Sequence, residues 1–80
     1  MNTLIVLTQR LNDLAWEIES KQKEAENWST AKSPYPEDLR VFETNKMDAK
    51  MQAELYKEQF KIVLKQIEEA IWLNLPLFLR

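Results

Sequence analysis

Apolar residues recur at alternating steps of three and four along the first third of the chain. Between residues 4 and 28, seven of the eight positions reached by these steps are apolar, and Lys21 is the exception. The seven are Leu4, Leu7, Leu11, Leu14, Ile18, Ala25 and Trp28. This spacing is that of the a and d positions of a coiled coil, which turn one apolar stripe toward a partner helix. With Asn2 or Thr3 as the cap, the pattern predicts a helix over residues 3–31.

The same steps return after the prolines at positions 34 and 36. Eight of nine positions are apolar, with Lys46 as the exception, and they are Phe42, Ala49, Ala53, Tyr56, Phe60, Val63, Ile67 and Ala70. Pro36 suits the first turn of a helix, and Glu37 and Asp38 suit the positive end of the helix dipole. The residue before Pro76 is pushed away from helical geometry. These features predict a second helix over residues 37–73.

Two helices joined by a short turn lie antiparallel. We therefore expect an all-α fold, a long antiparallel helical hairpin resembling a coiled coil, with residues 1–80 as a single domain. The connection is a proline-containing turn at 32–36, and an apolar tail follows at 74–80. Counted outward from the turn, Trp28 faces Phe42, and large residues face small ones farther along the hairpin.

The apolar side chains outnumber those that one hairpin can cover, and the surplus lies at its open end. The residues after Ala70 extend beyond the start of the first helix, so no residue of that helix can face them. Burying one large apolar side chain contributes roughly 1.5 to 3 kcal/mol, so these residues are expected to be covered. Either the tail folds back over Ile5, Val6 and Trp16 of its own chain, or hairpins associate.

Association of two hairpins into a four-helix bundle is the simplest closed assembly, so a homodimer is the first expectation. Another protein, or a weak membrane contact, is the alternative cover for the same residues. The predicted oligomer or partner interface consists of Leu4, Leu7, Phe60, Leu64, Ile67, Ile71, Trp72, Leu75, Leu77 and Phe78.

Composition supports a folded chain that needs help from a partner. Of the 80 residues, 45% are hydrophobic and 30% are charged, which is typical of a folded domain and not of a disordered tail. A core of this size is marginal, and small domains often add a disulfide, a metal or a partner. The absence of Cys excludes disulfides, and the absence of Cys and His removes the usual zinc ligands.

Charge argues against nucleic acid as a partner. Eleven basic and thirteen acidic residues give a net charge of −2, whereas non-specific binding to phosphate needs a positive excess. Lys57, Lys61 and Lys65 share one helix face, but glutamates follow or precede them by three or four residues, which is typical of a solvated, self-compensated face.

Catalytic chemistry is not expected. A chain without His, Cys or Gly has no histidine base, no thiol nucleophile and no glycine-rich phosphate loop. The sequence indicates no cofactor and no metal. We expect a small non-enzymatic protein-protein interaction module, such as an adaptor, regulator or inhibitor, acting through a helical surface and its apolar C-terminal end.

The turn region suggests a second class of function. Trp28, Lys32, Tyr35 and Arg40 combine aromatic and basic side chains, a composition suited to a partner or to a planar anionic ligand. The alternatives are therefore a small-ligand or nucleotide-binding sponge with sites at subunit interfaces, and a weak RNA-binding helical hairpin.

The apolar run at Leu4–Leu7 is too short for a signal peptide and follows no basic segment. No stretch reaches the roughly 18 to 20 apolar residues that cross a bilayer. Cytoplasmic localisation is the resulting expectation, with a membrane partner unlikely on these grounds.

Overall fold

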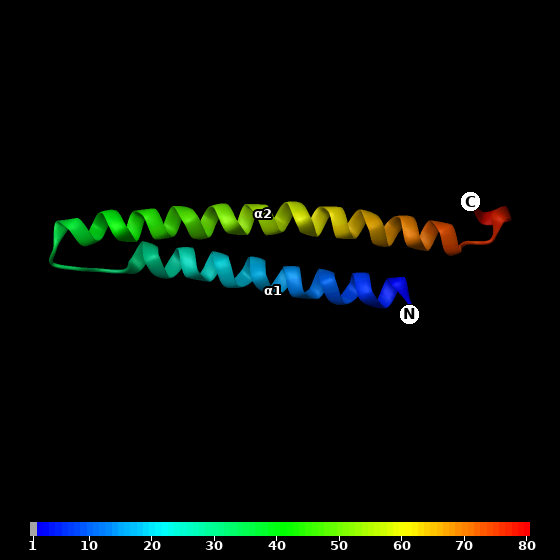
Figure 1. Ribbon diagram of the computed structural model, residues 1–80, viewed down its shortest axis with the longest axis horizontal. Coiled ribbons are helices and arrows are strands. Elements are labelled where there is room, and N and C mark those ends of the chain that lie inside the picture. The colour runs from blue at the N-terminus through cyan, green and yellow to red at the C-terminus, as the bar shows by residue number, and fades with distance from the viewer. Residues whose placement is uncertain (1) are drawn as a thin grey trace.

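The computed structural model describes residues 2–80, which form two long helices and one short 3-10 turn. Helix α1 spans Thr3–Thr30, helix α2 spans Pro36–Asn74, and the 3-10 turn η1 spans Leu77–Leu79. The two long helices run antiparallel, side by side (Figure 1). The molecule is a rod of 67 × 18 × 15 Å. The predicted all-helical hairpin is confirmed, and Met1 lies outside the described residues.

The sequence offers two candidate capping residues, Asn2 and Thr3, for the start of helix α1. Of the two candidates, Asn2 is the capping residue, because its side-chain oxygen accepts a hydrogen bond from the backbone N–H of Leu4 at 2.9 Å. Such a bond satisfies one of the first-turn N–H groups that lack a partner within the helix. The helix ends at Thr30, one residue before the expected end.

Helix α2 begins at Pro36, and a serine outside the usual capping position organises its start. Tyr35 occupies the cap position but makes no side-chain capping bond. Ser33 instead bridges the turn and the helix: its hydroxyl accepts from the backbone N–H of Tyr35 at 3.2 Å and donates to the Asp38 carboxylate at 2.7 Å. One hydroxyl thus joins the turn to the first turn of α2.

The seam between the helices contains the positions that the periodicity predicts. Five of the described residues are fully buried hydrophobics, and all lie on the seam: Leu14, Ala25, Ala49, Ala53 and Val63. The remaining seam positions are half-buried. Three of the five are alanines, so the backbones can approach closely around the single large, wholly buried side chain of Leu14.

Two contacts fix the register of the hairpin. The predicted pairing of Trp28 with Phe42 is confirmed, since their ring centroids lie 5.4 Å apart with the planes tilted by 33°. Nearer the open end, Arg10 Nη2 donates to Gln59 Oε1 at 3.0 Å. Both contacts agree with a hairpin whose helices are matched outward from the turn.

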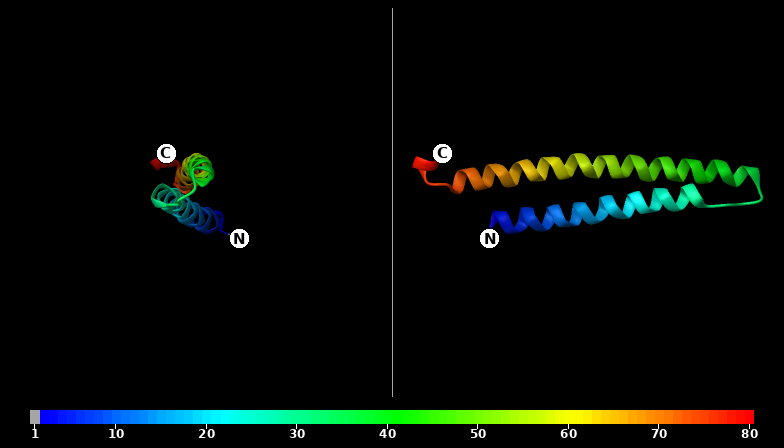
Figure 2. Two further views of the ribbon diagram at one scale, coloured as in Figure 1. Left: turned by 90° about the vertical axis from the view of Figure 1, so that its left-hand side faces the viewer. Right: turned by 180° about the vertical axis from the view of Figure 1, so that it is seen from behind.

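Helix α2 is longer than α1, so its last turns and the tail project beyond the start of α1 (Figure 2, right). The alternative in which the tail folds back over Ile5, Val6 and Trp16 is wrong. Those three side chains are exposed, and Trp16 keeps 66% of its surface open to solvent. Pro76 ends the helical path, and Arg80 then holds the tail against the end of α2 instead of against α1.

Candidate interaction surfaces

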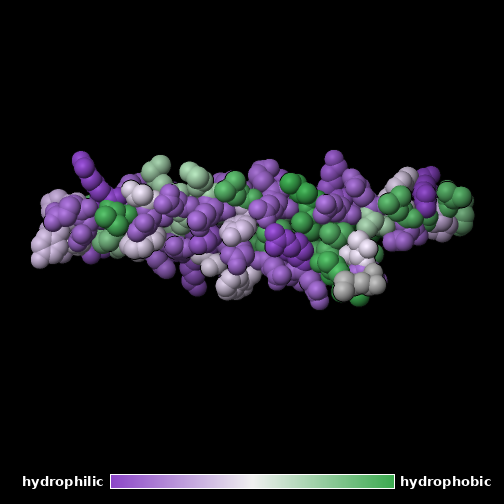
Figure 3. Space-filling view, in the orientation of Figure 1, coloured by the Kyte–Doolittle hydropathy of each residue, from purple (hydrophilic) through white to green (hydrophobic). Residues whose placement is uncertain are grey.

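The open end of the rod carries a cluster of exposed apolar side chains, which we call the apolar end. Its members come from the last turn of α2 and from the tail: Ile71, Trp72, Leu73, Leu77, Phe78 and Leu79. Leu77 and Phe78 are 81% and 84% exposed. Figure 3 shows hydrophobic surface concentrated at this end of the molecule, while the turn end is mostly hydrophilic.

Arg80 determines the shape of the apolar end. Its Nη2 donates to the carbonyl oxygen of Leu73 at 2.7 Å, and its Nε donates to that of Leu75 at 3.1 Å. The last carbonyl groups of a helix have no partner within the helix and carry the negative end of its dipole, which suits a guanidinium. No periodicity or motif in the sequence indicates this role for Arg80.

The predicted interface residues divide into two groups. Four are half-buried along the seam and already pack within the hairpin: Leu4, Leu7, Phe60 and Ile67. Five are exposed: Leu64, Ile71, Trp72, Leu77 and Phe78, while Leu75 is half-buried at the end of α2. Only the exposed group offers substantial free surface, and most of it belongs to the apolar end.

A second apolar surface, which the sequence analysis missed, lies on the side of α2 that faces away from α1. We call it the outer stripe, and it consists of Met47, Met51, Leu55 and Ile62. Each side chain is 59–62% exposed. Residues two apart on a helix point about 200° apart, and Met51 and Leu55 both lie two residues from the buried Ala53. Figure 3 shows hydrophobic patches along this outer edge of α2.

The signal for the outer stripe was present in the sequence as apolar residues spaced by four, four and seven. It was obscured because Glu58 interrupts it and because the seam residues show a longer and more regular pattern. A helix whose two opposite sides are both apolar has more apolar surface than one partner helix can cover.

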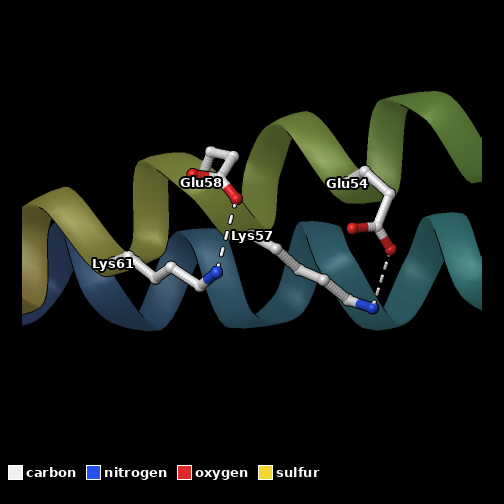
Figure 4. A network of polar contacts seen from close by, with 4 residues as sticks. All are labelled: Glu54, Lys57, Glu58 and Lys61. Atoms are coloured by element: carbon white, nitrogen blue, oxygen red, sulfur yellow. Dashed lines mark hydrogen bonds and ion pairs between the residues drawn. The ribbon is translucent and has the colours of Figure 1, made fainter.

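Ion pairs offset the charge of two lysines of α2. Lys57 Nζ lies 3.1 Å from Glu54 Oε1, and Lys61 Nζ lies 3.4 Å from Glu58 Oε1 (Figure 4). Two of the three lysines that share this face are thus paired within α2, as a self-compensated face requires, whereas Lys65 makes no ion pair among residues 2–80.

An open groove of about 560 Å³ runs between the helices. The buried Ala25 and Ala53 line it, and polar side chains that include Glu26, Lys50 and Lys57 stand around them. Because Lys57 is already paired, the groove combines an apolar floor with mixed charge and has no concentrated site for an anion. Within residues 2–80, no three acidic side chains come together in a group that could hold a metal ion.

The aromatic and basic residues near the turn do not share one environment. Trp28 is half-buried and packs on Phe42, so it belongs to the hairpin seam. Lys32, Tyr35 and Arg40 are exposed. The exposed three remain candidates for a partner contact, whereas Trp28 has a packing role.

Across residues 2–80, neither helix contains a stretch that is both long enough and apolar enough to cross a membrane. Comparison with protein-family models, with curated proteins and with solved structures finds no match to this chain.

Proposed function

We propose that this chain is a small, non-enzymatic protein-protein interaction module, whose first partner is a second copy of itself. One observation carries the proposal. Among residues 2–80, seventeen large hydrophobic side chains are exposed, against five hydrophobic residues that are fully buried. Soluble monomers rarely leave contiguous apolar patches larger than a few hundred Å² uncovered.

The arrangement of the exposed residues also supports binding. Ten of the seventeen gather in two surfaces, the apolar end and the outer stripe, on a framework of two long helices. Exposed Trp72 and Phe78 are the kind of aromatic side chain that contributes most to protein interfaces. An adaptor, regulator or inhibitor role follows naturally, because such proteins act by presenting a shaped surface.

The ligand and RNA alternatives have less support. Both are favoured by an excess of positive charge, yet acidic residues outnumber basic ones by thirteen to eleven, and Lys21, Lys57 and Lys61 pair with neighbouring glutamates within their own helices. The chain has no histidine, cysteine or glycine with which to build the common catalytic or phosphate-binding sites.

Analytical ultracentrifugation of the full chain tests the proposal. We expect the chain to sediment as a dimer or larger assembly over a wide concentration range. The double substitution Leu77→Ser with Phe78→Ser is expected to shift the chain toward the monomer, because it removes two large apolar side chains from the apolar end. The control is Trp16→Ser, which removes an exposed aromatic residue of α1 far from that end.

A chain that stays monomeric at every concentration, and that binds no protein from its source cells, would contradict the proposal. If the tail variant, the control and the unmodified chain sediment equally, the apolar end is not part of the interface.

A further inference from the structure

We propose that two copies pair antiparallel through the outer faces of their α2 helices, with the outer stripe of each copy packed against that of the other. The inference rests on the proposed function, since it takes self-association as its starting point, and it names the surface and the geometry. The α1 helices would then lie on the two outer sides of a flat, four-helix layer.

The outer face of α2 is free along its length. Helix α1 covers only the opposite side, where the buried alanines lie, so a second α2 can approach without displacing it (Figure 1, and end-on in Figure 2, left). Continued in steps of three or four residues, the line of the outer stripe runs from Arg40 to Leu73. The candidate contact thus extends over nearly the whole helix.

Charge decides between the two directions of pairing. In a parallel pair with matched register, each residue meets its own copy, so Glu58 would face Glu58, Lys65 would face Lys65 and Glu69 would face Glu69. Like charges placed directly opposite each other are destabilising. An antiparallel pair moves Lys65 and Glu69 well away from their own copies, and in the register below it moves Glu58 about 4.5 Å along the axis from Glu58 of the other copy.

One antiparallel register combines an apolar pair with a pair of opposite charges, while it places Leu55 opposite Glu58 and Met47 opposite Gln66. When Met51 faces Ile62 of the other copy, the same register places Asp48 opposite Lys65, and each pair occurs twice by symmetry. Within residues 2–80, the ion pairs use Lys21, Lys57 and Lys61, so Asp48 and Lys65 both remain free for an intermolecular pair. The symmetry axis of this register falls close to the middle of α2, which gives the longest overlap.

The same register brings the apolar end of one copy to the turn end of the other. Leu73 comes beside Arg40 and Val41 of the other copy, and the tail beyond it approaches Leu39 and Tyr35. In the single hairpin, Tyr35, Leu39 and Val41 are exposed hydrophobic residues. One interface would therefore cover the outer stripe, the apolar end and the apolar residues near the turn.

The size of this contact is sufficient for a specific dimer. The stretch from Arg40 to Leu73 is roughly 50 Å long at 1.5 Å per residue, and a helix is about 10 Å wide. The contact would bury roughly 500 Å² on each copy and about 1,000 Å² in total before the tail is counted, which reaches the lower limit for specific interfaces.

Single-cysteine variants test the geometry, because the natural chain contains no cysteine. Met51→Cys and Ile62→Cys are treated with a short bis-maleimide, separately and after mixing. In the proposed register, position 51 of one copy faces position 62 of the other. Two copies of the same position lie roughly 16 Å apart along the helix axis. We expect a cross-linked dimer from the mixture and little from either variant alone. The control mixture combines Ile62→Cys with Gln9→Cys, an exposed position on α1, and should not cross-link.

Cross-linking of each variant with itself would indicate a parallel pair and overturn the inference. A dimer in the ultracentrifuge without the mixed cross-link would also overturn it, while leaving the proposed function intact, because the copies would then meet elsewhere. A monomer without cross-links would overturn both the inference and the self-association in the proposed function, and would leave the outer face to a helix of another protein.

A charge exchange gives an independent test that does not remove apolar contacts. Asp48→Lys alone and Lys65→Asp alone each place like charges opposite one another twice, and each should raise the dissociation constant of the dimer by roughly three- to tenfold. The double variant Asp48→Lys with Lys65→Asp should restore it. Equal weakening by the double variant would contradict the register.

Discussion

Arg80 Nη2 donates a hydrogen bond to the carbonyl oxygen of Leu73 at 2.7 Å, so the end of the tail closes the end of α2. No basic residue lies in the last turn of the helix itself. The guanidinium therefore supplies both the missing donors and the positive charge that a helix C-terminus favours.

Replacing Arg80 with Ala is expected to release the tail and to weaken the end of α2. The expected loss in the free energy of unfolding is about 0.5 to 1.5 kcal/mol, which is typical of a hydrogen bond at an exposed site. Urea unfolding checks the stability, and amide hydrogen exchange of residues 71–79 checks the release. Lys23→Ala removes an equal charge from an exposed site on α1 and should leave exchange in the tail unchanged.

Leu14→Ala is expected to be the most damaging single truncation in the seam. Leu14 is 0% exposed, and removing a large buried side chain costs about 2.7 to 5 kcal/mol because a cavity remains. Circular dichroism during urea unfolding measures the loss. Ile5→Ala removes a side chain of similar size that is exposed, and it should cost far less. Equal costs would show that Leu14 is not the centre of the core.

Ala53→Leu tests whether the alanines set the distance between the helices. The site is almost completely buried, and adding side-chain volume to a well-packed seam costs about 1 to 3 kcal/mol. The same substitution at the exposed Ala15 adds the same atoms without forcing the helices apart. A thermal melt should separate the two variants, and a stable Ala53→Leu protein would contradict close packing at this position.

Ser33→Ala removes the hydroxyl that joins the turn to α2. Each lost hydrogen bond costs about 0.5 to 1.5 kcal/mol, and the substitution removes both the acceptor for the Tyr35 N–H and the donor to the Asp38 carboxylate. Ser29→Ala is the matched control, since that hydroxyl only bonds back to the carbonyl of Ala25 within α1. Urea denaturation should show a loss for Ser33→Ala and little change for the control.

The parts of this molecule that follow from local repetition were predictable from the sequence. Both seams, the proline turn and the Trp28–Phe42 pair result from the helical period and from counting outward along two helices of known direction. The helix ends were accurate to one residue because proline and asparagine act at fixed positions relative to a helix.

Two of the features that were missed depend on single side chains acting over irregular backbone. The direction of the tail depends on the Arg80 guanidinium reaching Leu73, which no periodicity encodes. The bonds of Ser33 to the Tyr35 N–H and to Asp38 depend on the conformation of the turn, which the sequence pattern does not specify. The outer stripe was present as a pattern, but a search for one apolar face per helix ignores a second one on the opposite side.

The unbroken run of α2 over 39 residues has a mechanical consequence. With no glycine in the chain, and with its prolines confined to the turn, the first residue of α2 and the tail, the rod lacks the usual weak points at which helices bend. Whatever is attached at its two extremities is kept apart by a fixed span, so the molecule has the properties of a stiff strut.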